Sequence, residues 1–264
     1  MIVALIDNGS LEPAAHRNLR AVADALTEGA GTIVHAVSWQ HSDRIAPAEI
    51  GGTPAWVLGN FVRSMHALGQ RDFIFVPFFI SPQGAIGSAL RRDMEKLQLE
   101  LGGFDFAFAP GLAETGAIPA IVAARVRESI VARKLRHPPV VLVDHGGPSA
   151  TSAALRDRLA GEARAQLGLE IAALTAASME GAHPPLLAGV LGTPGLANRE
   201  VIVMPLFLSP GRHAGPAGDI ARICGESPAS CHITSLVGTH PLARETLAVA
   251  LRAFLSTIPA QTSA

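Results

Sequence analysis

The sequence has no tyrosine, two tryptophans and ten phenylalanines among its 264 residues. Proteins that bind single-stranded nucleic acid by stacking need exposed aromatic rings, so this scarcity argues against that class. Lysine and arginine number 21 and aspartate and glutamate 22, for a formal net charge of −1. This balance offers no attraction to nucleic acid or to an anionic membrane, and we expect neither as a partner.

Cysteines and long apolar runs are also scarce. Cys224 and Cys231 are the only cysteines, so no disulfide framework is expected, and we interpret them as two ordinary thiols. No apolar run approaches the roughly 20 residues that span a bilayer. The apolar N-terminus lacks a basic leader and is interrupted by Asp7, which indicates a buried first strand rather than a signal peptide. We expect a cytoplasmic protein.

Two patterns occur twice in the sequence, in the same order and at nearly the same separation. Val-Ala-Leu-Ile-Asp-Asn-Gly-Ser at 3–10 resembles Val-Val-Leu-Val-Asp-His-Gly-Gly at 140–147. Phe-Val-Pro-Phe-Phe-Ile-Ser-Pro-Gln-Gly-Ala at 75–85 resembles Val-Met-Pro-Leu-Phe-Leu-Ser-Pro-Gly-Arg-His at 203–213. The pattern indicates an internal duplication. We expect two domains, 1–135 and 136–264, because the prolines at 138 and 139 end a helix.

Each half alternates short apolar runs with longer helical patterns, which predicts an α/β fold with parallel sheets covered on both faces. The expected strands are 2–7, 32–37, 72–79, 104–108, 139–144, 169–175, 200–207 and 231–236. The expected helices are 13–28, 53–69, 86–100, 117–134, 150–166, 184–191, 214–224 and 240–256. Four βα units per half predict two flavodoxin-like lobes with parallel four-stranded sheets in the order 2-1-3-4. Ligands of such sheets bind beyond the carboxyl ends of the strands.

Three chemically active side chains follow the first three strands of the second half. They are His145, Glu180 and His213, spaced by about one βα unit each. With the expected strand order they lie at one edge of neighbouring strands. Two imidazoles and a carboxylate bind divalent transition metals and also exchange protons near neutral pH.

The first half has different residues at the same positions. Asn8 corresponds to His145, Gln40 to Glu180 and Ala85 to His213. Asn, Gln and Ala do not exchange protons near pH 7 and are poor ligands for transition metals. We therefore expect the second lobe to carry the reactive groups and the first lobe to be catalytically degenerate.

The second half resembles the class II tetrapyrrole chelatases, most closely the sirohydrochlorin cobalto- and ferrochelatases of the CbiX/SirB type in their long two-lobe form. The Met-Pro-Leu-Phe-Leu-Ser-Pro-Gly-Arg-His stretch is the most specific motif. The matching segments are Asp144-His145-Gly146-Gly147, Ser178-Met179-Glu180, 204–213 and 236–241. Both halves match in layout, so the resemblance covers most of the chain. Many long members carry the site in the N-terminal lobe, whereas this chain carries it in the C-terminal lobe.

The resemblance implies insertion of Co²⁺ or Fe²⁺ into sirohydrochlorin without ATP, as in cobalamin and siroheme biosynthesis. It implies that His145, Glu180 and His213 bind the incoming metal or accept the pyrrole protons. Residues expected to contact the macrocycle are Ser10, Gly84, Gly146, Gly147 and Arg212. We expect no organic cofactor, since the divalent metal is a substrate. We also expect a monomer, because a duplicated chain already supplies both lobes.

Two alternatives remain open at this point. The chain is a chelatase-derived protein that binds a tetrapyrrole or a metal without turnover, or a chelatase for nickel or another macrocycle. His183, three residues after Glu180, is a weaker candidate for the same site, and His240, at the start of the last helix, is a weaker candidate for a functional role.

Overall fold

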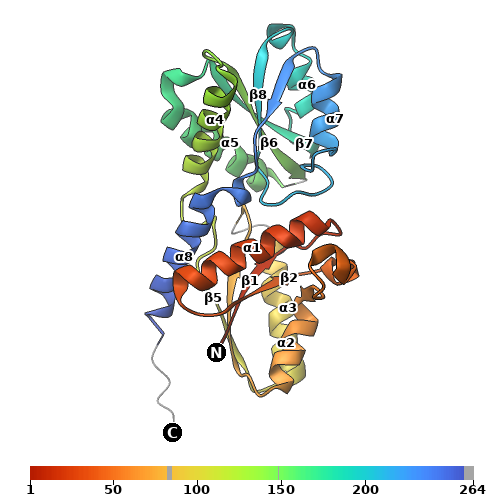
Figure 1. The fold of residues 1–264 in the computed structure, drawn as a ribbon, viewed down its shortest axis with the longest axis vertical. Coiled ribbons are helices and arrows are strands. Elements are labelled where there is room, and N and C mark those ends of the chain that lie inside the picture. Colours follow the sequence, from red (N-terminus) through yellow and green to blue (C-terminus); the bar gives the residue numbers. More distant parts are fainter. Residues whose placement is uncertain (82–84, 148, 259–264) are drawn as a thin grey trace. The chain divides into compact units, whose positions relative to one another are not determined.

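The computed structural model describes residues 1–81, 85–147 and 149–258. The chain forms two compact units, one of Met1–Gly116 with Pro241–Ala264 and the other of Ala117–His240. Each unit contains one parallel β-sheet with helices on both faces (Figure 1). The predicted α/β fold class is therefore confirmed.

The sheet of the first unit has the strand order β3-β2-β1-β4-β5. Its strands are β1 (Ile2–Asp7), β2 (Val34–Ser38), β3 (Trp56–Val57), β4 (Asp72–Pro77) and β5 (Asp105–Phe108). Its α-helices are α1 (Pro13–Ala30), α2 (Leu58–Ala67), α3 (Ala85–Leu101) and α8 (Pro241–Leu255). The predicted order is confirmed for four strands. The two-residue β3 was not predicted and makes a sheet of five strands, because it pairs with β2 after a segment of short 3₁₀ turns.

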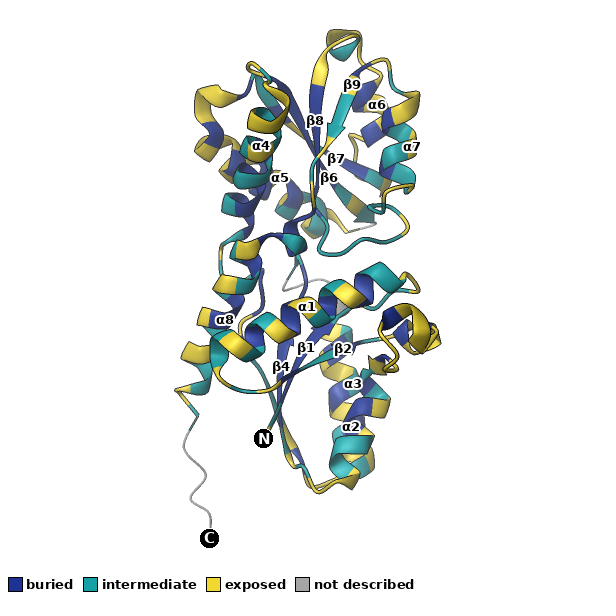
Figure 2. Cartoon of the chain, in the orientation of Figure 1, coloured by how far each residue is buried: buried dark blue, intermediate teal, exposed yellow. Residues whose placement is uncertain are grey.

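The core of the first unit has two sides, because side chains alternate along each strand. Ala4 and Ile6 of β1 belong to a buried cluster that includes Leu58 and Phe61 of α2 and Met94 of α3. Their neighbours on β1 are equally buried on the opposite face, where α1 and α8 lie against each other. Figure 2 shows both central strands of this sheet as buried and the outer faces of its helices as exposed.

The sheet of the second unit has the order β7-β6-β8-β9, which confirms the predicted order 2-1-3-4. Its strands are β6 (Pro139–Gly147), β7 (Ala173–Gly181), β8 (Glu200–Pro205) and β9 (Ser230–Ile233). Its α-helices are α4 (Ile118–Arg133), α5 (Ala150–Leu167), α6 (Leu187–Leu191) and α7 (Asp219–Glu226). β7 begins later than predicted, because residues 168–170 form a 3₁₀ turn. α7 also begins later, because Gly-Pro-Ala-Gly at 215–218 disfavours helix.

The compact units divide the chain differently from the expected ranges of 1–135 and 136–264. α4 contacts α5, and its Arg125 donates hydrogen bonds to the Leu236 carbonyl and the Thr239 hydroxyl, all in the second unit. α8 packs against α1 in the first unit, so closely that a Cβ on Gly29 would lie 2.6 Å from the Cβ of Ala248. Each unit therefore includes a helix from the other half of the sequence. Local sequence patterns do not reveal this, because it depends on contacts between residues far apart in the chain.

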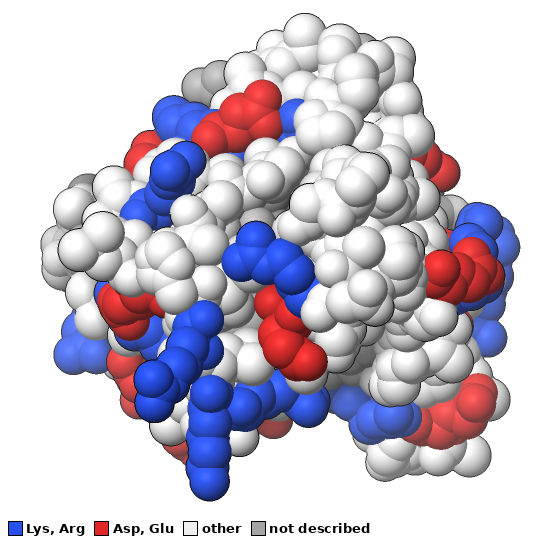
Figure 3. Space-filling model, turned by 90° about the horizontal axis from the view of Figure 1, so that it is seen from above, with Lys and Arg blue, Asp and Glu red and all other residues white. Residues whose placement is uncertain are grey.

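Charged side chains of both signs lie on the face shown in Figure 3, and several Lys and Arg side chains gather in its lower part. Most of that face is uncharged, and basic and acidic side chains lie close to one another. Over the described ranges, none of the helices has the length and apolar character to cross a membrane.

Candidate functional site

His145 and Glu180 lie side by side at the carboxyl ends of β6 and β7. The two strands are in parallel register, with Gly146 opposite Glu180, and His145 Nε2 is 3.5 Å from Glu180 Oε1. Both side chains are more than half exposed, at 53% and 61%. The edge of the sheet thus presents an imidazole and a carboxylate together to solvent, as the sequence predicted.

Gly146 allows the two strand ends to approach this closely. Its φ is +83°, and a Cβ there would lie 1.8 Å from the carbonyl oxygen of Glu180. No residue with a side chain fits this backbone without displacing β7. The glycine after His145 is therefore a structural requirement of the His145–Glu180 pair.

His213 joins the same group from the loop that follows β8. Its ring lies edge-on to that of His145, with centroids 4.7 Å apart and an interplanar angle of 84°. His213 Nδ1 is 2.8 Å from Asp219 Oδ2, within ion-pair distance, although the contact does not meet the geometry of a hydrogen bond. The His213 side chain is only 16% exposed. Its second nitrogen, Nε2, remains for a proton or a metal.

Asp219 is a member of this group that sequence reasoning missed. It is the first residue of α7, and its Oδ2 is also 3.6 Å from Nε of Arg212. An acidic residue in the first turn of a helix is a common helix-start signal, and that signal could have drawn attention to it. The Arg212 side chain is 84% exposed, so its guanidinium remains accessible to a ligand.

The geometry joins the predicted residues as pairs. His145 contacts Glu180 on one side and His213 on the other. Within the described part of the chain, no three His, Cys, Asp or Glu side chains are arranged to hold one metal ion. The three-residue metal set therefore stays a prediction, which requires at least one exposed side chain to rotate.

A buried hydrogen-bond network lies directly beneath the pair. The Ser178 hydroxyl donates to Asp144 Oδ1 at 2.6 Å, and Arg156 Nη1 donates to Ser178 Oγ at 2.5 Å. Arg156 is 2% exposed. Burial raises the pKa of the Asp144 carboxyl, and the Ser178 hydrogen bond and the Arg156 charge oppose that rise. Asp144 and Ser178 therefore fix the strands immediately before His145 and Glu180.

The first unit contains the same backbone arrangement with other side chains at the edge. Asp7 is opposite Ser38, and Asp7 Oδ1 accepts a hydrogen bond from the N–H of Gly9 at 3.0 Å. Gly9 has φ +85°, and a Cβ there would lie 1.7 Å from the carbonyl oxygen of Gln40. Burial raises the pKa of Asp7 to about 6. Asn8 and Gln40 are exposed at this edge, which matches the predicted correspondence to His145 and Glu180.

The remaining predicted positions are distributed over both units. Ser10 donates its N–H to Ser42 Oγ in the first unit. Gly147 ends β6 beside the site, whereas Gly84 lies outside the described residues.

The carbonyl of His183 accepts a hydrogen bond from Arg156 at 3.4 Å. His240 is buried, with Nε2 3.5 Å from Glu128 Oε1, which assigns it a structural contact within the second unit.

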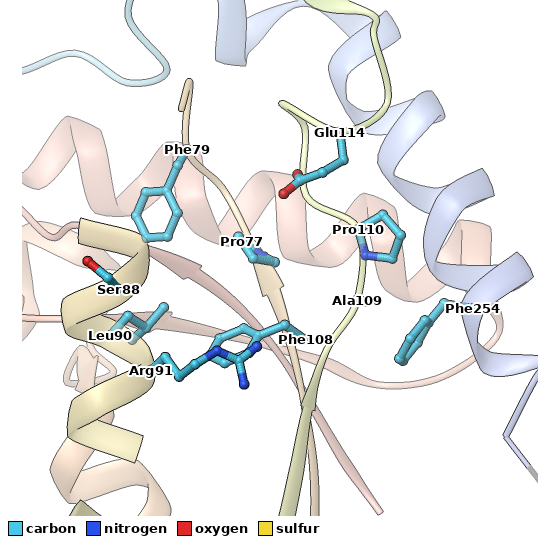
Figure 4. Close-up of a pocket in the computed structure, with 10 residues that line it drawn as sticks. All are labelled: Pro77, Phe79, Ser88, Leu90, Arg91, Phe108, Ala109, Pro110, Glu114 and Phe254. Carbon is cyan, nitrogen blue, oxygen red and sulfur yellow. The ribbon is translucent and has the colours of Figure 1, made fainter. Parts of the chain in front are cut away.

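A separate cavity of about 580 Å³ lies in the first unit, beyond the carboxyl ends of β4 and β5 (Figure 4). Its wall is largely apolar and includes Phe79 and Phe108. The Arg91 guanidinium lies 4.9 Å from the centroid of the Phe108 ring, and Glu114 accepts the N–H of Gly111. The volume is typical of small-molecule pockets, but none of the predicted site residues lines it.

Comparison with known proteins gives no match to a family model or to a curated protein sequence. Solved structures do match. SirB from Bacillus subtilis with Fe³⁺ has a TM-score of 0.67 at 12% identity, over 96% of this chain and 95% of that chain. CbiX, described as the terminal enzyme for biosynthesis of siroheme in denitrifying bacteria, has a TM-score of 0.65 at 17% identity, over 96% and 97%.

A third structure, SirB from Bacillus subtilis subspecies spizizenii in complex with cobalt, has a TM-score of 0.66 at 13% identity, with 97% of both chains covered. Over nearly its full length, the chain therefore has the fold of the class II chelatases SirB and CbiX. The resemblance that the motifs suggested is confirmed at the level of the fold.

Proposed function

We propose that this protein is a chelatase that inserts Co²⁺ or Fe²⁺ into a sirohydrochlorin-like tetrapyrrole without ATP. The observation that carries the proposal is the contact of His145 with both Glu180 and His213 at the carboxyl edge of a sheet with the chelatase fold. Ligands of parallel α/β sheets bind at this edge.

The residue types suit the chemistry of metal insertion. A divalent ion that enters the macrocycle displaces two protons from the ring nitrogens, so the site needs bases that work near neutral pH. In this proposal His145 and His213 accept these protons or hold the incoming metal, and Glu180 assists His145. Asp219 beside His213 Nδ1 leaves Nε2 of that ring for the reaction.

The metal is a substrate here, and the proposal includes no organic cofactor. Imidazole and carboxylate suit several divalent ions, and cellular supply often decides among them. Two of the similar structures are described with Fe³⁺ or cobalt, which supports iron and cobalt as the first metals to test. Nickel belongs in the same screen.

The macrocycle is proposed to contact Ser10, Gly84, Gly146, Gly147 and Arg212. Glycines at the end of β6 leave room for a flat ring, and the exposed Arg212 suits a bidentate contact with a ring carboxylate. Asn8, Gln40 and Ala85 mark the first unit as the degenerate copy. We further propose that the protein is a cytoplasmic monomer.

The test is the absorbance change of metal insertion with purified protein, sirohydrochlorin and Co²⁺ or Fe²⁺. We expect acceleration by the wild type and loss of most of it in His145→Ala and His213→Ala. His137→Ala, at an exposed histidine just before β6, is the control and should match the wild type.

Two results would change the proposal. If both site variants retain the wild-type rate, the site assignment is wrong. If the wild type binds sirohydrochlorin tightly without accelerating insertion of any metal, including nickel, the protein is a tetrapyrrole-binding derivative of a chelatase.

A further inference from the structure

Arg156 is a buried charge, which requires a physical explanation. It is 2% exposed, and it is the only Lys, Arg, Asp or Glu among the buried residues that the structure describes. Burial of a guanidinium costs free energy unless its donors are paired. The hydrogen bonds of the Arg156 guanidinium must therefore offset the free-energy cost of its burial in the middle of α5.

The contacts of Arg156 join four segments of the second unit. Nη1 donates to Ser178 Oγ on β7 and, at 3.4 Å, to the carbonyl of His183 in the segment after β7. Nε donates to Asp157 Oδ1 at 2.8 Å on the same helix. Ser178 passes the connection to Asp144 of β6. One side chain thus holds α5, β6, β7 and the following loop together.

The connected residues stand directly before the site. Asp144 precedes His145 in β6, and Ser178 is two residues before Glu180 in β7. Both strand ends continue outward from the network to the 3.5 Å contact of His145 with Glu180. A shift of either strand end would change that contact.

The first unit shows that the fold does not require this arginine. α1 and α5 both have 18 residues and follow the first strand of their sheet, and the seventh residue of each is Leu19 and Arg156 respectively. Leu19 is fully buried. In the first unit, Ser38 is bonded instead by the Ser42 hydroxyl at 2.8 Å. The buried arginine is therefore present in the unit that has His145 and Glu180, and a leucine takes its place in the unit that has Asn8 and Gln40.

From this comparison we infer that Arg156 is a positioning residue of the second unit. It sets the carboxyl ends of β6 and β7 so that His145 and Glu180 act on one metal ion or proton. This inference rests on the proposed function for the role of the pair. Residues behind a metal-binding histidine or carboxylate commonly change metal affinity by about 10- to 100-fold when they are replaced.

The test compares Arg156→Leu, which introduces the residue of the first unit, with Arg156→Lys and Ser178→Ala. Arg158→Leu is the matched control, because it makes the same change on an exposed arginine of α5 that pairs with Glu162. For each variant, we would measure Co²⁺ affinity, kcat and KM of Co²⁺ insertion, the urea unfolding midpoint, and amide exchange at 144–147 and 178–181.

We expect Arg156→Leu to lower Co²⁺ affinity or kcat by at least about tenfold, with KM for the tetrapyrrole little changed. Ser178→Ala should show a smaller loss of the same kind, and Arg156→Lys should recover part of it by keeping a donor. Amide exchange should accelerate at both strand ends in Arg156→Leu and remain unchanged in Arg158→Leu.

The inference is overturned if Arg156→Leu and Ser178→Ala match the wild type, or if their losses only follow the unfolded fraction. Should Arg156→Leu not fold, Arg156→Lys and Ser178→Ala decide. If the wild type neither binds nor inserts Co²⁺, the proposed function fails, and amide exchange still tests Arg156. Faster exchange in Arg156→Leu than in Arg158→Leu supports positioning, and equal exchange excludes it.

Discussion

Gly146 and Glu180 approach each other through their backbones, and a single added carbon at Gly146 would lie 1.8 Å from the Glu180 carbonyl oxygen. Gly9 and Gln40 repeat this relationship in the first unit at 1.7 Å. The same close approach exists with a His-Glu pair and with an Asn-Gln pair. It is therefore a property of the fold, present both in the unit that carries the His-Glu pair and in the unit that does not.

Gly146→Ala should destabilise the protein by more than the strain of positive φ alone, which is about 1–2 kcal/mol. The added methyl group must displace β7, and we expect loss of metal insertion with it. Gly51→Ala is the matched control, because Gly51 has φ +84° with no atom within 4 Å of its added Cβ. Equal unfolding free energies of the two variants in urea would contradict the steric argument.

Restoring the missing groups in the first unit should add little activity. Asn8→His combined with Ala85→His supplies two imidazoles but lacks the carboxylate at Gln40 and the buried arginine at Leu19. We expect insertion rates within about twofold of the wild type, whereas loss of His145 or His213 removes most of the activity. A rate several-fold above the wild type would show that the first unit is still competent.

Asp219→Asn should weaken Co²⁺ binding by about tenfold or more, because it removes the negative charge 2.8 Å from His213 Nδ1. Glu226→Gln changes an exposed carboxylate on the same helix and should leave the affinity unchanged. Titration of Co²⁺ by its absorbance compares the two variants. Equal affinities would remove Asp219 from the site.

His16 should make the first unit sensitive to acid. It is 1% exposed, and neither ring nitrogen has a hydrogen-bond partner among the described residues. Burial, with a smaller contribution from Arg20, lowers the pKa of His16 from 6.5 to about 4. The unfolded chain then takes up a proton at higher pH than the folded protein does. Stability contributed by the neutral ring is therefore present above pH 6.5 and decreases toward pH 4, by up to about 3 kcal/mol.

Urea unfolding at pH 7 and pH 4.5 tests this prediction with His16→Leu. The variant should lose less unfolding free energy than the wild type between the two pH values. His137→Leu, at an exposed position, should lose as much as the wild type. Parallel pH dependence of all three proteins would show that His16 is not the titrating group.

Asp7 should make the first unit more stable in acid, which is the opposite of the effect expected for His16. Burial raises its pKa from 3.8 to about 6, opposed by hydrogen bonds from Ser38 and Gly9. A raised folded-state pKa means that the protonated carboxyl stabilises the fold fully below pH 3.8, and that this contribution is lost as the pH rises through 6. Asp7→Asn should therefore gain unfolding free energy relative to the wild type at pH 8 and gain less at pH 4. Asp43→Asn, at an exposed position, controls for net charge.

The strand order and the His145–Glu180 pair were predictable because both depend on local patterns. Apolar runs mark the strands, and parallel strands bring their carboxyl ends to one edge. Asp219, Arg156 and His16 were not predictable, since their significance comes from burial and from partners distant in the sequence. β3 was missed because two residues carry no periodicity.

α4, from the first half of the sequence, belongs to the second unit, and α8, from the end of the sequence, belongs to the first unit. This assignment sets the order in which the two units are completed during synthesis. The second unit, Ala117–His240, is contiguous, so all of it is synthesised before α8. The first unit begins earlier but lacks α8, the partner of α1, until translation passes residue 255. The unit that starts the chain is thus completed last, and the surface of α1 that packs against α8 has no partner helix until α8 has been synthesised.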